Sequence, residues 1–279
     1  MKALISILRE EFHKSLIQQG ILTIDKNEVP SNADKDSRLS REISLYIAKK
    51  LEAETRKKCE GQTLGGKFEI ATMDFILKTF HYLNSLRPGK WHISRLGNRN
   101  SIKTSSFVQY QHLDYLKDLT RKDVLLASSL GNDYMVAPDI VVYREPEPDE
   151  IINSDCLLID NAVSTLSVIR QSANKLPILH ASISAKWTMR SDRAQNSRTE
   201  ALGLIRNRKG HLPHIDVVTA EPLPSRLASL ALGTGDIDCV YHFALYELIE
   251  AVKYTGAEDS IEMLDILIEG KRLKDISDL

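Results

Sequence analysis

Short apolar runs rich in Val and Ile recur through the second half of this chain, and helix-like segments separate them. The runs cover residues 134–143, 156–159, 176–187, 215–220 and 237–243. Helical patterns follow at residues 191–208, 243–253 and 261–268. Runs of this length, bounded by turn-forming and charged residues, are typical of buried strands. Because these strands alternate with helices, they predict an α/β fold with a central mixed sheet flanked by helices.

Helical periodicity dominates the first third of the chain, where apolar residues recur every three or four positions. Helices are expected at residues 4–17, 39–51 and 66–86. The polar stretch at 21–37 should form a loop, and the Arg-Pro-Gly sequence at 87–89 should end the third helix. We therefore predict one domain of 279 residues, with a mainly helical portion over 1–90 and a mixed core over 91–279.

Composition is that of an ordinary globular protein. Hydrophobic residues make up 42% of the chain, and no apolar run approaches the ~18–20 residues that cross a bilayer. The N-terminal apolar stretch is interrupted by Arg9, Glu10 and Glu11, which indicates an amphipathic helix rather than a signal peptide. The three cysteines are far apart and form no Cys-x-x-Cys motif, which argues against a disulfide scaffold or a cysteine zinc site. We expect a cytoplasmic protein without a membrane partner.

Charge is informative only locally. The chain carries 37 basic and 38 acidic residues, but residues 186–211 contain seven basic and only two acidic side chains. A concentrated basic patch on an otherwise acidic chain is what a bound polyanion such as nucleic acid requires. A solvated helix face is the alternative interpretation of the same run, and charge alone does not decide between the two.

An acid in an apolar run is the first candidate for chemistry. Asp139 lies in the first of these runs, where a buried carboxylate has to be paired, hydrogen-bonded or bound to a cation. Period-two alternation places Ser184 and Lys186 on one face at the end of a later strand, and Glu200 lies on the helix that follows. Two strands and a helix can bring these side chains into one cleft.

Such a cleft would suit metal-dependent phosphodiester hydrolysis. Two carboxylates hold a divalent cation such as Mg²⁺ through oxygen ligands, and a nearby ammonium neutralises phosphate charge and orients a water. Each of these residue types is common, so a structural role for Asp139 stays open beside the catalytic one.

The residues directly after the strand that contains Lys186 add a second feature. Arg190, Asp192 and Arg193 lie where the next helix begins. Arginine can donate two hydrogen bonds to guanine, and aspartate can accept one from cytosine. The three side chains could therefore read G·C pairs beside a metal site. Capping of the helix by Asp192 or its neighbour is the alternative, and it does not exclude base contacts by the arginines.

Long strings match one nuclease family in order and spacing. They include GQT…FE (61–69), RPGKW (87–91), HASISAKWTMRSDRAQNSRTE (180–200), RNRKGHLPHI (206–215), VVTAEPLPSR (217–226) and GKRLKDISDL (270–279). With these strings the chain resembles the NgoMIV-type restriction endonucleases over nearly its whole length, and least over residues 95–130 and 145–178. The resemblance implies the PD-(D/E)xK restriction-endonuclease-like fold, in the variant whose second acid has moved from the strand to the next helix.

The resemblance implies a role for each catalytic position. Asp139 would be the main ligand of Mg²⁺, Lys186 would be the catalytic lysine, and Ser184 stands where the usual nuclease has its second acid. The acidic site and the metal ligands would be completed by Glu200, Glu69 and the carbonyl oxygen of Ala185.

DNA-reading residues are implied in the same way. The inner CCGG would be read by Arg190, Asp192 and Arg193. The outer G·C pair would be read by Asp34 and Arg226, with Gln62 as a further DNA contact. The implied substrate is double-stranded DNA with the palindrome GCCGGC, cut by Mg²⁺-dependent hydrolysis to leave 5′-phosphate ends and 5′ overhangs.

The resemblance also implies partners. Members of the family act as homodimers that assemble into homotetramers and engage two DNA sites. A cognate DNA methyltransferase is expected in the host, but not as a stable subunit.

Two other functions remain open at this point. A structure-selective DNA resolvase or repair nuclease of the same fold would share Asp139 and Lys186 but would not need the Arg-Ser-Asp-Arg segment. A non-catalytic DNA-binding regulator would use the basic patch and would have no need of the acids.

Overall fold

The computed structural model describes residues 2–55, 61–96, 103–130, 138–189, 191–233 and 235–279. Two compact units are built from interleaved stretches of the chain. Unit 1 comprises Met1–Tyr82, Ile183–Thr199 and Ile215–Leu279. Unit 2 comprises Leu83–Ser182 and Glu200–His214. The single domain, with its helical portion over 1–90, stays a prediction.

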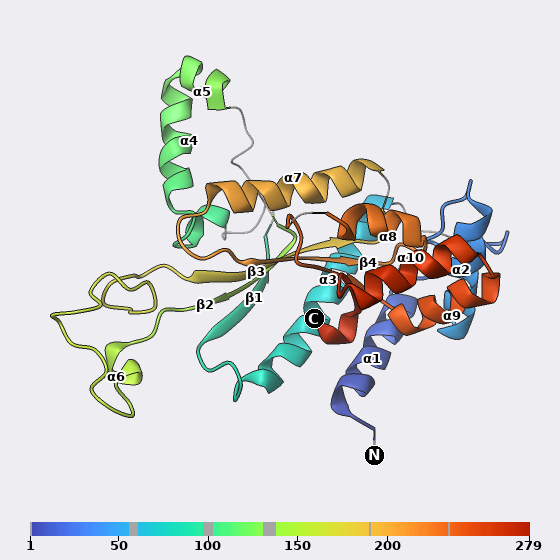
Figure 1. Ribbon diagram of the computed structural model, residues 1–279, viewed down its shortest axis with the longest axis horizontal. Helices are drawn as coiled ribbons and strands as arrows, with labels where there is room; N and C mark the ends of the chain where they lie inside the picture. Colours follow the sequence, from blue (N-terminus) through green and yellow to red (C-terminus); the bar gives the residue numbers. More distant parts are fainter. Residues whose placement is uncertain (1, 56–60, 97–102, 131–137, 190, 234) are drawn as a thin grey trace. The chain divides into compact units, whose positions relative to one another are not determined.

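Unit 1 contains the predicted N-terminal helices and the closing helices of the chain. They are α1 (Leu4–Gln18), α2 (Arg38–Lys50), α3 (Gly61–Phe80), α8 (Pro224–Ala231), α9 (Leu245–Thr255) and α10 (Glu258–Glu269). Figure 1 shows α2 beside α9 although the two are far apart in the sequence, and α1 packs against α3 in the same unit. The side chain of Ser37 accepts a hydrogen bond from the backbone N–H of Ser40, which caps the first turn of α2.

The third helix differs from its predicted bounds. It begins at Gly61 instead of Gly66, and it ends at Phe80, where a 3-10 turn over His81–Leu83 takes over. Periodicity located the apolar stripe but not the start, because the first turn carries glycine and polar residues that give no periodic signal.

Parallel strands of unit 1 lie next to one another with a regular register. They are β4 (His214–Thr219), β5 (Cys239–His242) and β6 (Leu273–Asp275). Val217 is opposite Val240, and Val240 is opposite Leu273. The strand β6 was not predicted from the sequence, because three residues with a single apolar side chain show no alternation. The buried position of Cys239, 5% exposed, follows from its place on β5.

Unit 2 contains an antiparallel pair of strands and short helices. The elements are β1 (Trp91–Arg95), β2 (Ile140–Arg144), α4 (His112–Lys122), α5 (Val124–Leu130), α6 (Asp149–Ile152) and a 3-10 turn (Thr104–Ser106). Ile93 of β1 is opposite Val142 of β2. The strand predicted to begin at residue 134 begins at Ile140, and residues 134–137 lie outside the described residues. The strand β1 was not predicted, because it is only five residues long, and in the structure its central residue alone is buried.

The short strand predicted at 156–159 is wrong. The side chain of Asn153 accepts hydrogen bonds from the backbone N–H groups of Leu158 and Ile159, at 3.0 and 2.9 Å. The side chain of Leu157 is 82% exposed and that of Leu158 is 65% exposed. These residues therefore form an exposed loop whose backbone polar groups bond locally instead of joining a sheet.

Within the described residues the strands follow the order β1-β2-β3-β4-β5-β6, where β3 spans Ile178–Lys186. The sheet is mixed, because β1 and β2 are antiparallel while β4, β5 and β6 are parallel. The helix predicted from residue 191 is α7 (Ser191–Asn207). The prediction of an α/β fold with a mixed sheet and flanking helices is confirmed (Figure 1).

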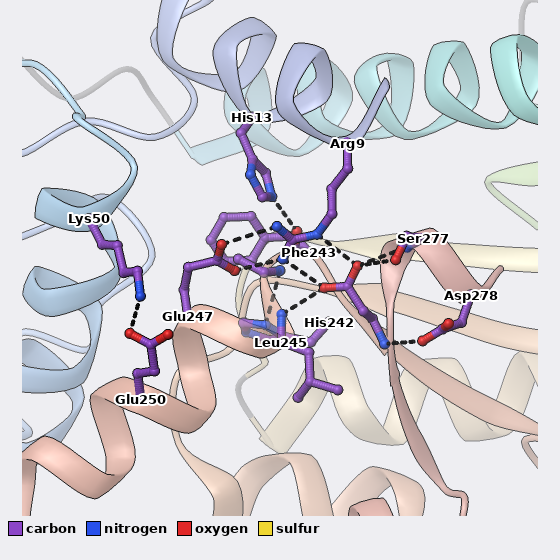
Figure 2. A network of polar contacts seen from close by, with 12 residues as sticks. Arg9, His13, Lys50, His242, Phe243, Leu245, Glu247, Glu250, Ser277 and Asp278 are labelled. Carbon is purple, nitrogen blue, oxygen red and sulfur yellow. Dashed lines mark hydrogen bonds and ion pairs between the residues drawn. The ribbon is translucent and has the colours of Figure 1, made fainter. Parts of the chain in front are cut away.

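A buried polar network ties the first helix of unit 1 to its C-terminal elements (Figure 2). The guanidinium of Arg9 donates two hydrogen bonds to the carboxylate of Glu247 on α9 and two to that of Asp275 on β6. On the next turn of α1, a ring nitrogen of His13 lies 2.7 Å from the carbonyl oxygen of Phe243. These contacts fix α1 against segments more than two hundred residues away.

No helix in the described stretches is both long and apolar enough to cross a membrane.

Asp216 makes the stability of unit 1 depend on pH. Burial, together with the negative charge of Asp238, raises the pKa of Asp216 to about 7. The unfolded carboxyl ionises near pH 4, so stability falls as pH rises from about pH 4 to pH 7. Replacing Asp216 by Asn should remove this penalty, with a gain of at most about 4 kcal/mol above pH 7 and none at pH 4. Urea unfolding at pH 4 and pH 8 measures it, and an equal effect at both values would contradict the assignment.

Candidate functional site

The end of β3 carries three of the predicted site residues. Ser184, Ala185 and Lys186 are its last three residues, and Ser184 and Ala185 are buried while Lys186 is half-buried. The strand alternation places Ser184 and Lys186 on the same face. The side chain of Trp187 follows directly, with its ring 5.0 Å from that of Phe68 and 5.5 Å from that of Phe243. This packing holds the end of the strand in unit 1.

Asp139 lies immediately before β2, at the end of the strand, which is one of the two positions expected for it. Its backbone carbonyl accepts a hydrogen bond from the N–H of Leu96 at 3.1 Å, which continues the pairing of β1 and β2 by one residue. The residue is half-buried, so its position at the strand end leaves it partly accessible. A carboxylate in this position can serve a bound cation without the full penalty of burial.

The other two predicted acids lie on helices. Glu69 is half-buried on α3, next to the fully buried Phe68, and Glu200 is half-buried on α7. Glu69, Ser184 and Lys186 belong to unit 1, whereas Asp139 and Glu200 belong to unit 2. The arrangement of all five around one cation stays a prediction.

The donor set fits magnesium in its chemistry. Asp139, Glu69 and Glu200 offer carboxylate oxygens, and Ala185 offers a carbonyl oxygen. Oxygen-only ligands are what Mg²⁺ prefers, and no histidine or cysteine in this set would favour zinc. Over the described residues, no group of three or more His, Cys, Asp or Glu side chains is arranged to hold a metal ion.

The structure brings Asp34 and Arg226 into direct contact. The guanidinium of Arg226, on the first turn of α8, forms an ion pair with the carboxylate of Asp34. The backbone N–H of Asp34 donates to the side chain of Ser40 at 2.9 Å, which fixes the loop before α2. The side chains of Asp34 and Arg226 are 18% and 32% exposed. Asp34 and Arg226, which are predicted to read the same base pair, are therefore in contact, and both side chains are partly exposed to solvent.

Glu221 is a residue of this region that was not predicted from the sequence. It is 1% exposed, and its carboxylate accepts hydrogen bonds from the N–H of Met189 at 2.9 Å and from that of Leu223 at 3.2 Å. Its Oε2 lies 3.8 Å from Nη1 of Arg226. Burial raises the pKa of Glu221 to about 7, against the lowering effect of these partners. The sequence did contain a signal for Glu221, because this acid directly follows an apolar run and precedes a proline. In the Pro138-Asp139 pair the order of acid and proline is reversed.

For the remaining predicted DNA-contacting residues, only the position in the sequence or in a helix is known. Arg190 lies outside the described residues. Asp192 and Arg193 are the second and third residues of α7, and Gln62 is the second residue of α3. The side chains of these four residues are outside what the structure describes, so their roles stay predictions.

One arginine of the basic patch at residues 186–211 makes structural contacts. The guanidinium of Arg198 donates to the carbonyl oxygen of Leu232 at 2.7 Å and lies 3.9 Å from the carboxylate of Asp236. These contacts join α7 to the segment that follows α8 within unit 1. Two histidines outside this stretch pack against each other, since the rings of His180 and His214 lie 5.1 Å apart. Burial lowers the pKa of His180 to about 4, which keeps this residue neutral at ordinary pH.

Comparison with known proteins gives one family. A model of the NgoMIV restriction enzyme family matches residues 12–279. The chain is 46% identical over 280 residues to the type II restriction enzyme NgoMIV of Neisseria gonorrhoeae, and the alignment covers 100% of this chain and 98% of that protein.

Solved structures of other restriction endonucleases are more distant. Bse634I restriction endonuclease is 15% identical, with a TM-score of 0.37 over 89% of this chain and 91% of that one. PspGI restriction endonuclease, solved with substrate DNA, is 14% identical, with a TM-score of 0.30 over 98% of this chain and 89% of that one.

Proposed function

We propose, from the premise that this chain belongs to the NgoMIV restriction enzyme family, that it is a type II restriction endonuclease that hydrolyses double-stranded DNA at the palindrome GCCGGC. The observation that carries the proposal is the full-length match, at 46% identity, to a protein named as a type II restriction enzyme. A match over the whole length includes every position to which a catalytic or reading role is assigned below.

The proposed cofactor is Mg²⁺, held by carboxylate oxygens of Asp139, Glu200 and Glu69 and by the carbonyl oxygen of Ala185. When bound, the ion lowers the pKa of a coordinated water and offsets the charge of the scissile phosphate. The all-oxygen donor set supports this choice of metal.

The side chain of Lys186 takes the second role in the proposed reaction. Its side-chain amine, in the neutral form, orients the attacking water or takes a proton from it, and the resulting ammonium balances the negative phosphate oxygens. Ser184 lies on the same face of β3 as Lys186 and completes this part of the proposed site. The products in this scheme are a 5′-phosphate and a 3′-hydroxyl, with 5′ overhangs.

Sequence reading is assigned to two sets of side chains. Arg190, Asp192 and Arg193 read the inner CCGG, while Asp34 and Arg226 read the outer G·C pair, with Gln62 as a further contact. The ion pair of Asp34 and Arg226 supports the second assignment, because one donor and one acceptor held together suit the two edges of one G·C pair.

The proposed assembly follows from the target. A palindrome is matched by a two-fold dimer in which each subunit reads one half-site, and two such dimers form the homotetramer. We place the enzyme in the cytoplasm, beside a host methyltransferase that protects the same sequence without being a stable subunit.

A plasmid digest tests this function. A plasmid with two GCCGGC sites should give two discrete fragments in Mg²⁺ and remain intact in excess EDTA, whereas a matched plasmid with ACCGGT at both positions should remain uncut. Nicking without sequence preference, or only at branched DNA, would instead indicate the resolvase or repair nuclease. Slower migration of the uncut plasmid in a gel, without any cleavage, would indicate the non-catalytic regulator.

A further inference from the structure

A single buried carboxylate connects the two parts of the chain to which base reading is assigned. Oε2 of Glu221 accepts the N–H of Met189, the residue directly before Arg190, and the same oxygen faces the guanidinium of Arg226. Through Arg226 the connection continues to Asp34. All of these described contacts lie within unit 1.

The backbone around Glu221 is held on both sides. Its own N–H donates to Oγ1 of Thr219 at 3.2 Å, and its Oε1 accepts the N–H of Leu223, at the start of α8. On the preceding residue, the carbonyl oxygen of Ala220 accepts a hydrogen bond from the side-chain amide of Asn32 at 2.9 Å. The loop that contains Asp34 is thereby attached to the same segment.

A carboxylate in this environment is costly for the fold. The residue is 1% exposed, and an acid buried so deeply is destabilising unless its hydrogen bonds and a positive charge compensate it. An apolar residue of similar volume would avoid that cost, but it would remove the acceptor of the Met189 N–H and leave Arg226 with Asp34 as its remaining carboxylate in this group. The position of the acid is therefore better explained by what it orients than by stability.

We propose that Glu221 is a positioning residue for DNA reading, which fixes the backbone of Met189 relative to the Asp34–Arg226 pair. The inference rests on the proposed function, because it takes the reading roles of these residues from there. Glu221 itself does not touch DNA. It sets the spacing between the inner and the outer readers, so that both engage only when all base pairs of a half-site are correct.

The test is a pair of discrimination ratios for E221Q. The amide has one acceptor oxygen, so the N–H of Met189 or of Leu223 loses its acceptor, and the charge that faces Arg226 is removed. Dissociation constants are measured in Ca²⁺ for a GCCGGC duplex, for an ACCGGT duplex with changed outer pairs, and for a GCATGC duplex with changed inner pairs. Each discrimination ratio is the dissociation constant for a changed duplex divided by that for the GCCGGC duplex. We expect both ratios to fall about tenfold or more, because misplacing a base-reading side chain loses a discrimination of that order.

The matched control is D216N. Asp216 is a second buried acid whose pKa is raised to about 7, but the groups that shift this pKa are Asp238, Lys274 and the backbone of Cys239, and none of them is assigned a reading role. Both ratios of D216N should equal those of the wild type. A loss of folded protein lowers the active concentration equally for all three duplexes, so it does not change a ratio. If circular dichroism shows E221Q largely unfolded, E221D replaces it, since it keeps the charge and withdraws the carboxylate by one methylene.

The outcomes distinguish the positioning role from the proposed function. A fall in both ratios supports the inference, and wild-type values for either ratio overturn it. If the wild-type protein itself does not distinguish GCCGGC from the other duplexes, the proposed function fails, whatever E221Q shows.

Discussion

Replacement of Asp139 by Asn should abolish cleavage of GCCGGC in Mg²⁺ while sequence-specific binding in Ca²⁺ persists. The amide keeps the size of the side chain and removes the charge that holds the cation. Because a bound metal contributes several kcal/mol to the hydrolysis, we expect kcat to fall by at least ~10³-fold. Single-turnover cleavage and gel retardation with one duplex measure the two properties separately.

Asp155 provides the control for this variant. It is an exposed aspartate of the same unit, in the loop after α6, and no role is assigned to it. D155N should cleave at the wild-type rate. Cleavage by D139N within tenfold of the wild-type rate would remove Asp139 from the catalytic site, whereas loss of binding together with cleavage would assign it a structural role.

The second large effect is expected on stability, from Arg9→Met. The side chains of Arg9 and Glu247 are each 12% exposed and that of Asp275 is fully buried, so the variant leaves two acids without their cation in the network of Figure 2. Breaking a buried ion pair from one side costs about 3–5 kcal/mol. For a chain of this length that corresponds to a fall in Tm of roughly 10 °C. Thermal unfolding followed by circular dichroism measures it.

The pH dependence of this effect has a definite sign. Burial opposes ionisation of Glu247 and Asp275, but the hydrogen bonds from Arg9 hold the pKa of each carboxyl below its ordinary value. Their stabilisation is therefore present above about pH 4 and is lost as pH falls below it. The difference in stability between wild type and R9M should shrink in acid. Arg38→Met is the control, because the Arg38–Glu42 pair is exposed and should contribute little. Equal Tm values for R9M and R38M would contradict the role of the network.

The parts of the fold that follow local periodicity could be predicted from the sequence. The run at 176–187 became β3 (Ile178–Lys186), and the run at 237–243 became β5 (Cys239–His242). The strand β1 was not found, because it is only five residues long and its pairing with β2 is a tertiary contact that the local sequence does not show. The strand predicted at 156–159 is wrong because the leucines there are exposed. Periodicity reports the apolar character of residues but not their burial.

The candidate site shows a similar division. Asp139 lies just before β2, and Ser184 and Lys186 lie at the end of β3. A polar side chain next to an apolar run is visible in the sequence. The contact of Asp34 with Arg226 joins residues nearly two hundred positions apart, and the resemblance to a known family, not spacing, suggested it. Glu221 was missed because the sequence cannot show that a charged residue is buried or which backbone N–H groups it accepts.

The central claim is that an acid, a lysine and a later acid from separate stretches surround one magnesium ion beside the residues that read the DNA. The most direct measurement is a crystal structure of the protein with a GCCGGC duplex and Ca²⁺, which binds without supporting cleavage. We predict a cation ligated by Asp139 at the scissile phosphate, with Lys186 and Glu200 around it and Arg226 on the outer guanine. A structure with Asp139 and Lys186 on opposite surfaces, or with the cation away from both, would contradict the claim.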